Sequence, residues 1–204
     1  MKIGIIGRGR VAQALAKAFA DNHELRLGVR SVANPSEAEI GDVARWSDVI
    51  LLATPWGAKE DICKAIGDHA ANKPVIDATN PVGMHKGMLD LVHEGPDSAA
   101  ETLQARLPTA HVVKCFNQIG AEFLHDTAKL ANTPVMFAAS DHATAKDIAP
   151  TLARDAGFEA VDGGPLSNAR HLESLAMIWI WSATKGPLGR SFGFALSHMK
   201  SKET

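Results

Sequence analysis

Tyrosine is absent from this chain of 204 residues, and all aromatic residues together make up only 5% of it. A chain without tyrosine cannot contain the Tyr-x-x-x-Lys arrangement with which short-chain dehydrogenases deliver a proton to a carbonyl group. Carbonyl reduction of that kind is therefore excluded, and any chemistry here needs another proton donor or none.

Cysteine is also scarce, because the chain has only Cys63 and Cys115, which lie far apart in the sequence. Without a Cys-x-x-Cys pair or a repeated spacing, they predict neither a disulfide framework nor a zinc site, and we predict no metal site. Both lie near apolar segments, where we expect them to be small buried side chains.

The chain has no excess of positive charge and no long apolar run. Its 21 basic and 23 acidic residues give a formal net charge of -2, which favours a small-molecule ligand over nucleic acid or anionic lipid. The apolar stretch Leu175–Trp181 is much shorter than the roughly 20 residues that cross a bilayer. The N-terminal run Met1–Gly7 also lacks the apolar length of a signal peptide. We therefore expect a cytoplasmic protein without nucleic-acid or membrane partners.

Short strand-like runs alternate with segments that have helical spacing. Hydrophobic residues make up 46% of the chain and charged residues 22%, as in ordinary globular proteins. Alternation of this kind predicts an α/β fold with a doubly wound, parallel sheet and helices on both faces. The expected strands are Lys2–Ile6, Leu25–Val29, Val49–Ala53, Pro74–Asp77, His111–Cys115, Pro134–Ala138 and Phe158–Val161.

Two other segments affect the expected organisation. Residues Asn80–Gly95 form the main irregular stretch, which we expect at the edge of a pocket. A loop at Asp162–Pro165 leads into a helix that is apolar nearly all round in its second half. That helix is either covered by the core of its own subunit or shared in a dimer interface, and a pocket wall is compatible with both. We therefore divide the chain into a nucleotide-binding domain, 1–162, and a C-terminal helical segment, 163–204.

A glycine-rich loop follows the first expected strand. Gly7-Arg8-Gly9-Arg10-Val11-Ala12 fits the pattern G-x-G-x-x-G/A between a strand and a helix, which is typical of dinucleotide binding. The first glycine permits the tight turn, the second lets the backbone approach a pyrophosphate, and a small residue at the last position allows close helix packing. We expect Gly7, Arg8, Gly9, Arg10 and Val11 to contact the cofactor.

The end of the second expected strand indicates which cofactor binds. NAD enzymes usually place an acidic residue about 20 residues after the loop, where it bonds to the adenosine ribose. This chain instead has Gly28-Val29-Arg30-Ser31. An arginine can bind a ribose 2′-phosphate through charge-assisted hydrogen bonds, and Ser31 adds another donor. Arg30 and Ser31 therefore favour NADP(H).

Polar residues follow three further strands. In open α/β sheets, ligands bind beyond the carboxyl ends of the strands, so these residues are expected to converge on the nicotinamide half of the cofactor. Asn117 is a candidate for orienting the reacting groups rather than for transferring a proton. The expected contacts at these strand ends are Ala53, Thr54, Pro55, Trp56, Asn80, Pro81 and Asn117.

With these segments the chain resembles the NADPH-dependent reductases of coenzyme F-420, an 8-hydroxy-5-deazaflavin, a family that includes the cytosolic domains of six-transmembrane metalloreductases. The segment Gly164–Leu175 and the tail Gly186–Phe194 carry the resemblance together with the motifs above. It implies a Rossmann-type, mainly parallel sheet with a C-terminal helical extension. It also implies hydride exchange between NADP(H) and a deazaflavin or flavin, and a homodimer. Arg8 and Arg10 depart from the family pattern, as does the single arginine at Arg30.

The expected chemistry needs little acid or base catalysis, which fits the lack of tyrosine. When hydride passes between two stacked rings, positioning and exclusion of water do most of the work, and we assign no residue as acid or base. An NADPH-dependent reductase of flavin or of a ferric chelate is an alternative. A pyrroline-carboxylate or imine reductase is less favoured, since few residues remain after Pro165 for its helical domain. A regulator that senses NADPH without chemistry is the alternative of another class.

Overall fold

The computed structural model describes residues 1–92 and 97–199. The strands are β1 (Lys2–Ile6), β2 (Glu24–Val29), β3 (Glu37–Glu39), β4 (Val49–Leu52), β5 (Pro74–Asp77), β6 (Val82–His85), β7 (Met88–Leu91), β8 (His111–Lys114), β9 (Val135–Ala138) and β10 (Glu159–Asp162). The α-helices are α1 (Arg10–Phe19), α2 (Ile40–Trp46), α3 (Lys59–Ile66), α4 (Ala99–Arg106), α5 (Ala143–Asp155) and α6 (Ala169–Thr184).

The central sheet is parallel, and its six described strands run in the order β3-β2-β1-β4-β5-β8. The chain first builds outward from β1 to β2 and β3, and then crosses to β4 and continues to β5 and β8 on the other side. The direction therefore reverses between β1 and β4, which is the place where open α/β sheets bind ligands. The predicted doubly wound α/β fold is confirmed.

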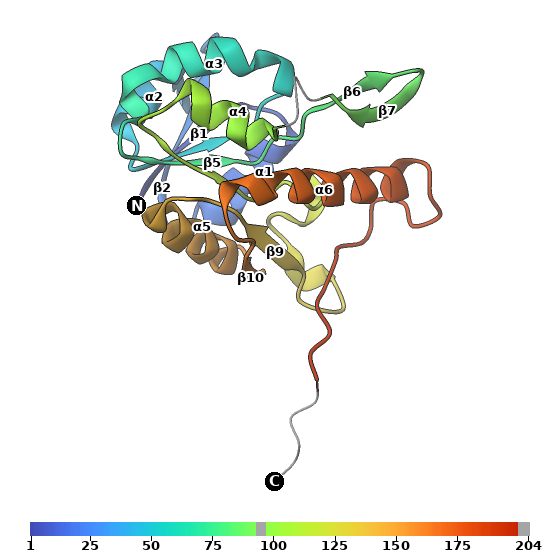
Figure 1. The fold of residues 1–204 in the computed structure, drawn as a ribbon. Coiled ribbons are helices and arrows are strands. Elements are labelled where there is room, and N and C mark those ends of the chain that lie inside the picture. The colour runs from blue at the N-terminus through green and yellow to red at the C-terminus, as the bar shows by residue number, and fades with distance from the viewer. Residues whose placement is uncertain (93–96, 200–204) are drawn as a thin grey trace.

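Both faces of the sheet are buried, as the alternation along β1 illustrates. Ile3 and Ile5 belong to the core formed with α1 and α5, whereas Ile6 belongs to the core formed with α2, α3 and α4. Figure 1 shows these two groups of helices on opposite sides of the sheet. Successive strand side chains point to opposite faces, so two helical layers bury strands that are apolar throughout.

Two expectations about strands need correction. The last two predicted strands, β9 and β10, pair in parallel with each other in a second sheet, which meets the first through an antiparallel bridge between Lys114 and Ala139. The stretch Asn80–Gly95 is not irregular throughout, because β6 and β7 form an antiparallel hairpin. Residues 93–96 of that stretch lie outside the described part. A turn with positive φ at Lys86 (48°) and Gly87 (79°) joins the two strands, as in tight hairpins.

The predicted C-terminal helix is present as α6, preceded by a short 3₁₀ turn at Leu166–Asn168. Leu172, Ala176 and Trp179 are buried, while Ile178 and Trp181 in the second half are each 58% exposed. After α6 the chain turns back along the helix (Figure 1), and the indole Nε1 of Trp179 donates to the carbonyl of Phe192 (3.1 Å). One face of the helix, which includes Trp179 in its second half, is thus covered by its own subunit.

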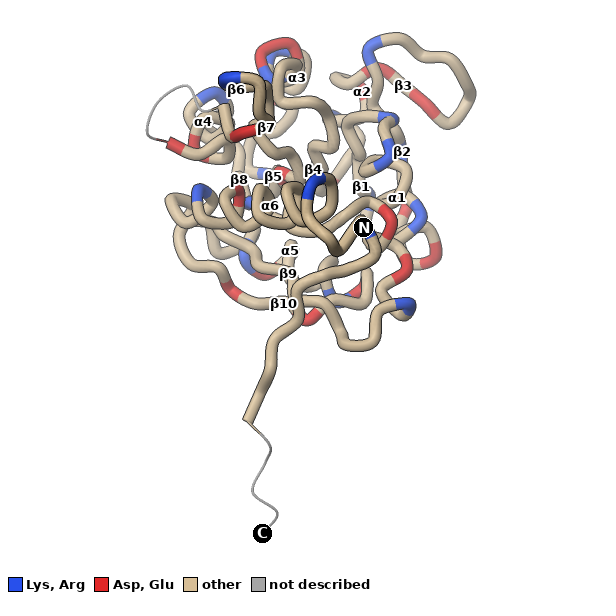
Figure 2. Tube along the Cα trace, turned by 90° about the vertical axis from the view of Figure 1, so that its right-hand side faces the viewer, with Lys and Arg blue, Asp and Glu red and all other residues tan. Residues whose placement is uncertain are grey.

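The two cysteines are buried, as the sequence predicted, and basic and acidic residues are mixed over the surface. Cys63 and Cys115 are buried, and burial raises the pKa of the Cys63 thiol to about 11 and that of Cys115 to about 12. Figure 2 shows lysine and arginine spread among acidic residues over many elements. None of the described helices is long and apolar enough to cross a membrane.

Candidate functional site at the carboxyl edge of the sheet

The glycine loop has the backbone that its sequence requires. Gly7 has a φ of 129°, and a Cβ added there would lie 2.4 Å from the carbonyl oxygen of Ala53, so no larger residue fits between β1 and β4. Gly9 is extended and caps α1, and a Cβ added to it would meet no atom within 4 Å. Gly7 is therefore required for the close contact between β1 and β4, whereas Gly9 leaves open space in front of the N-terminus of α1.

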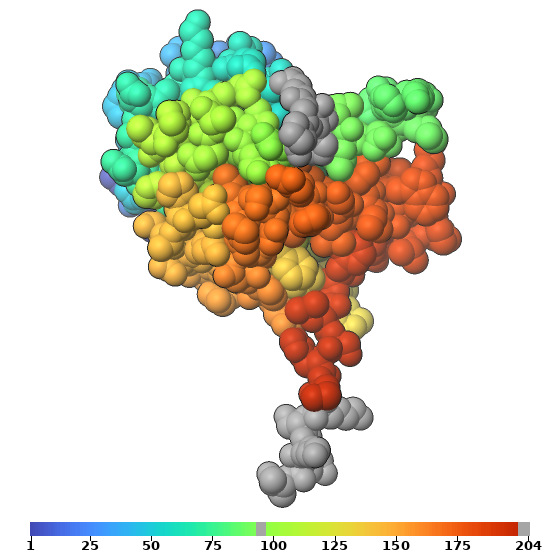
Figure 3. Space-filling model, viewed as in Figure 1, coloured from blue at the N-terminus to red at the C-terminus, as the bar shows by residue number. Residues whose placement is uncertain are grey.

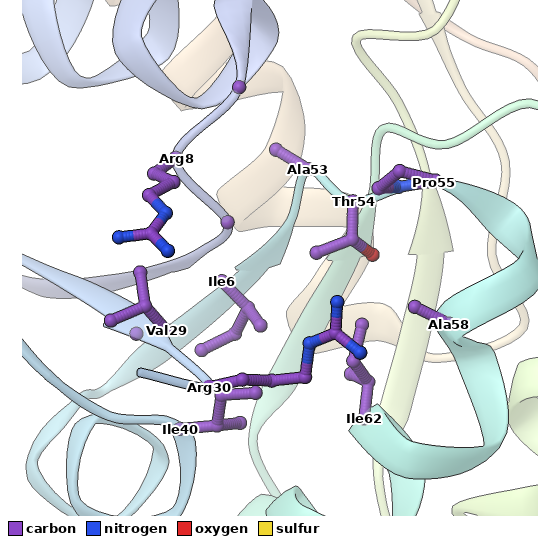
Figure 4. Close-up of a pocket in the computed structure, with 13 residues that line it drawn as sticks. Ile6, Arg8, Val29, Arg30, Ile40, Ala53, Thr54, Pro55, Ala58 and Ile62 are labelled. Carbon is purple, nitrogen blue, oxygen red and sulfur yellow. The ribbon is translucent and has the colours of Figure 1, made fainter. Parts of the chain in front are cut away.

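A cavity of about 320 Å³ opens beside this loop, and Figure 4 shows the side chains around it. It lies at the ends of β1, β2 and β4, where the chain direction reverses. The starts of α2 and α3 close its far wall. Its lining residues are Ile6, Gly7, Arg8, Gly9, Gly28, Val29, Arg30, Ile40, Ala53, Thr54, Pro55, Ala58 and Ile62.

Two guanidinium groups reach this cavity from different elements. Arg30 follows β2 and extends along the cavity toward Thr54 and Ile62 (Figure 4). Its Nη1 lies 4.0 Å from the carboxylate of Asp61, and both side chains are 73% exposed, so this pair constrains Arg30 only weakly. Arg8 lies above Val29 in the same view. The predicted Arg30 is thus at the cavity, and Ser31 is an exposed neighbour.

Arg8 does not turn toward the open space at Gly9. Its Nη1 donates to the carbonyl of Ser31 (3.4 Å) and lies 3.5 Å from the carboxylate of Glu37. That carboxylate accepts the N–H of Ala33 (2.8 Å), and this bond and Arg8 together hold the pKa of Glu37 below its ordinary value, against the opposing effect of burial. Glu37 is a site neighbour that the sequence did not reveal.

Arg10, the other arginine of the loop, turns away from the cavity. It forms an ion pair with Glu122, which also accepts from Nε of Arg190 (2.7 Å). The hydrogen bond from Arg190 and the positive charge of Arg10 keep the pKa of Glu122 low. Val11 is half-buried and packs against the core of the α1 face. Neither Arg10 nor Val11 lines the main cavity.

Asn80 and Asn117 meet where β5 and β8 end. Each donates its side-chain amide to the other residue, at 2.9 Å from Asn80 to the carbonyl of Asn117 and at 3.0 Å from Asn117 to Oδ1 of Asn80. Asn117 also donates to the carbonyl of Leu172 in α6 (3.1 Å) and accepts from Gln118 (2.9 Å). The two amides therefore join the strand ends to α6, and the orienting role of Asn117 stays a prediction.

The remaining predicted contacts flank this pair. Thr54 and Pro55 line the main cavity, whereas Trp56 is buried against a smaller adjoining hollow that Thr54, Pro55 and Thr79 share. Pro81 is buried at the start of the segment that leads to the hairpin. The structure thus brings the expected strand ends to one edge, but it separates Trp56 from the main cavity.

A buried ion cluster supports the same edge, and the sequence did not predict it. The Nζ of Lys114 lies 2.9 Å from a carboxylate oxygen of Asp77 and 2.8 Å from one of Glu173, and all three side chains are 0% exposed. It also donates to the carbonyl of Thr79 (2.6 Å). Burial alone lowers the pKa of Lys114, but the two carboxylates outweigh it and raise the pKa above its ordinary value.

The cluster joins four elements. Asp77 ends β5 and accepts the N–H of Thr79 (2.9 Å), Lys114 ends β8, and Glu173 in α6 accepts the first N–H of α4 from Ala99 (3.2 Å). In the sequence, the cluster was visible only as a charged residue at the end of two strands, Asp77 and Lys114, and as an acidic residue, Glu173, on the apolar side of a helix. These signals are weak one by one, because strand ends and helices commonly carry exposed charges.

Comparison with known proteins fits this geometry. The family profile described as NADP oxidoreductase, coenzyme F420-dependent, matches residues 2–81. The F420-dependent NADP reductase of Methanothermobacter thermautotrophicus is 30% identical in an alignment 206 positions long, which covers 88% of this chain and 88% of that relative. The chain belongs to this family. It is therefore an NADP-dependent oxidoreductase.

Three other proteins are similar to this chain in sequence or in fold. Metalloreductase STEAP3 of Rattus norvegicus is 29% identical over 185 residues, and the chain spans only 36% of its length. A solved structure from Arthrobacter sp. FB24, provisionally described as an F420-dependent NADP reductase, has a TM-score of 0.87 at 28% identity and covers 97% of this chain and all of that one (100%). An imine reductase of Myxococcus stipitatus (TM-score 0.66, 14% identity) shares the fold alone, over 92% of this chain and 64% of its own.

Proposed function

We propose that this family member transfers hydride between NADP(H) and a deazaflavin or flavin-type acceptor. The observation that carries the proposal is the cavity between the ends of β1 and β4, where the order of strand addition reverses, with the glycine loop on one side and two arginines on its walls. The name of the Methanothermobacter relative supports the acceptor class, because it is an F420-dependent NADP reductase that matches along most of the chain.

The residues of the cavity fit a phosphorylated dinucleotide. The open space in front of Gly9 admits an anion to the N-terminus of α1, where the first N–H groups lack partners within the helix. Arg8 and Arg30 offer cationic groups beside the end of β2, where the adenosine ribose lies in such folds. Ile40 and Ile62 supply apolar walls of the kind that cover a base.

We assign the chain's own residues to the two halves of the cofactor. Gly7 and Gly9 hold the pyrophosphate with the start of α1, and Arg30 and Ser31 bind the 2′-phosphate. The strand ends from Thr54 to Asn117 position the nicotinamide half and exclude water from it. Bound NADPH itself supplies the hydride, so the protein contributes placement rather than a proton donor.

Reduction of a free flavin or a ferric chelate is the second candidate, and the similarity to metalloreductase STEAP3 favours it. One experiment separates the candidates. Purified protein and NADPH are mixed in turn with 8-hydroxy-5-deazaflavin, flavin mononucleotide, ferric citrate and a cyclic imine, and the loss of absorbance of the reduced nicotinamide is followed. We expect the fastest oxidation with the deazaflavin. Faster oxidation with flavin mononucleotide or ferric citrate would favour the second candidate. Tight NADPH binding without oxidation by any acceptor would instead support a regulator.

We also propose a homodimer formed through an apolar surface on the hairpin and the end of α6. These two parts lie side by side and project from the body in Figure 3. A second copy suits the surface, because the family resemblance implies a homodimer. The exposed apolar residues are Met84, Met88, Leu89, Ile178, Trp181 and Leu188, each between 43% and 70% exposed.

Light scattering after gel filtration tests this interface. The wild-type protein is expected at twice the mass of one chain, and Trp181→Glu is expected at the mass of one chain, because a charge cannot be buried unpaired between subunits. Ser174→Glu adds the same charge at an exposed position in the first half of α6 and is expected to stay dimeric. A wild-type monomer, or a Trp181→Glu dimer, would contradict the proposed interface.

A further inference from the structure

We propose that Arg8, aimed by the carboxylate of Glu37, binds the 2′-phosphate of the cofactor and helps to select NADP over NAD. The inference rests on the proposed function, and it adds a specificity-determining residue and a positioning residue to the expected pair Arg30 and Ser31. It starts from the direction of Arg8. Although this residue stands between the two glycines of the phosphate loop, its guanidinium lies at the end of β2, by the carbonyl of Ser31.

Glu37 fixes that direction. Its side chain is only 4% exposed and its carboxylate is held by the N–H of Ala33 (2.8 Å), so the carboxylate is a fixed anchor at the start of β3. The bond from Ala33 and the charge of Arg8 keep the pKa of Glu37 low, and the anchor is therefore charged at neutral pH. A long arginine side chain that is already held loses less conformational entropy when it binds a ligand.

The rest of the guanidinium remains available to a ligand. Within the described residues, the contacts of Arg8 with Ser31 and Glu37 both use Nη1, so the N–H groups of Nε and Nη2 point to no protein acceptor there. The side chain is 50% exposed and lines the same cavity as Arg30. Figure 4 shows Arg8 above Val29 and Arg30 running along the cavity toward Thr54 and Ile62, so the two arginines line different parts of it. A ligand in the cavity can therefore meet cationic donors from two walls.

The chemistry of that position suits a phosphate. A phosphate monoester carries close to two negative charges and three acceptor oxygens, and arginine binds such groups through two parallel N–H bonds. A ribose with a free 2′-hydroxyl has no charge for Arg8 to bind. Arg8 is therefore expected to strengthen the binding of NADP and to leave the binding of NAD nearly unchanged.

Binding of two cofactor fragments tests the inference without any turnover. Isothermal titration gives the affinities of adenosine 2′,5′-bisphosphate and adenosine 5′-monophosphate for each variant. Arg8→Ala is expected to weaken the bisphosphate about tenfold or more, the size of a lost charged hydrogen bond, and to change the monophosphate less than about twofold. Glu37→Gln keeps the size of the side chain but removes its charge, and it is expected to weaken only the bisphosphate, by about threefold or more.

Two further variants complete the test. Arg45→Ala removes an exposed arginine of α2 that does not line the cavity, so both affinities are expected to stay at the wild-type values. Arg8→Lys restores the charge without the planar fork and is expected to recover part of the lost affinity, which a purely structural role would not predict. Thermal unfolding of each variant shows whether it is folded.

The outcomes separate this inference from the proposed function. If the wild-type chain binds the bisphosphate no better than the monophosphate, the NADP assignment itself is wrong. If the wild type prefers the bisphosphate and Arg8→Ala keeps that preference, or loses both fragments equally, the role of Arg8 is wrong. Tighter binding of the bisphosphate by Glu37→Gln would show that the carboxylate repels the phosphate, and it would overturn the positioning role of Glu37.

Discussion

Lys114→Met is expected to lower the free energy of unfolding by about 3–5 kcal/mol, the usual cost of removing one partner from a buried ion pair. The ammonium of Lys114 lies within 2.9 Å of Asp77 and Glu173, and all three side chains are fully buried. Methionine fills a similar volume, but it leaves two carboxylates facing each other without water or a cation. The loss therefore comes from charge rather than from packing. Denaturation in urea, followed by circular dichroism, measures it.

Two control variants define the result. Glu173→Gln leaves Asp77 and Lys114 as a pair whose charges cancel. The free energy of unfolding is therefore expected to fall by only about 1–3 kcal/mol, as for one buried group with an imperfect partner. Lys64→Met makes the same exchange on the exposed side of α3 and is expected to change stability by less than about 0.5 kcal/mol. If Lys114→Met were as stable as Lys64→Met, the cluster would not hold the sheet edge.

Gly7→Ala is expected to lower both stability and NADPH affinity, whereas Gly9→Ala is expected to lower mainly NADPH affinity, although each adds one methyl group to the same loop. In Gly7→Ala the methyl group would lie 2.4 Å from a backbone oxygen, and φ is 129°, so strain and overpacking are expected to cost about 1–3 kcal/mol each. The strand β1 and the loop must then shift. Both stability and NADPH affinity are expected to fall.

In Gly9→Ala the backbone is extended and the methyl group would meet no atom within 4 Å, so the free energy of unfolding is expected to fall by no more than about 1 kcal/mol, the cost of alanine in place of glycine at an N-cap. The same methyl group occupies the space through which a pyrophosphate approaches, and NADPH affinity is expected to fall about tenfold or more. Urea denaturation and titration of NADPH fluorescence give the two quantities. Wild-type affinity in Gly9→Ala would place the phosphate elsewhere.

The elements that the sequence predicted well are those fixed by local patterns. The strand β1, the glycine loop and the start of α1 follow from the spacing of three small residues and from the apolar run before them. The position of Arg30 at the cavity follows from the strand that precedes it. Local backbone preferences and the rule for strand ends were enough in these cases.

The features that the sequence did not predict depend on contacts between distant segments. Asp77, Lys114 and Glu173 meet only because two strands and a helix pack together, and nothing near each residue indicates its partners. The direction of Arg8 depends on Glu37, which lies in the edge strand β3. That strand has only three residues, too few for an apolar pattern to predict it. The hairpin turns at Lys86-Gly87, which is less typical of such turns than Asn-Gly.

Isotope transfer tests the central claim most directly. NADPH in which both hydrogens at C4 of the nicotinamide are replaced by deuterium is mixed with the protein and 8-hydroxy-5-deazaflavin, and the reduced acceptor is analysed by mass spectrometry. Direct hydride transfer predicts deuterium bound to C5 of the deazaflavin in proportion to the NADPH oxidised, because a hydrogen on carbon does not exchange readily with water. Oxidation of NADPH without deuterium in the reduced deazaflavin would contradict direct hydride transfer between the two rings.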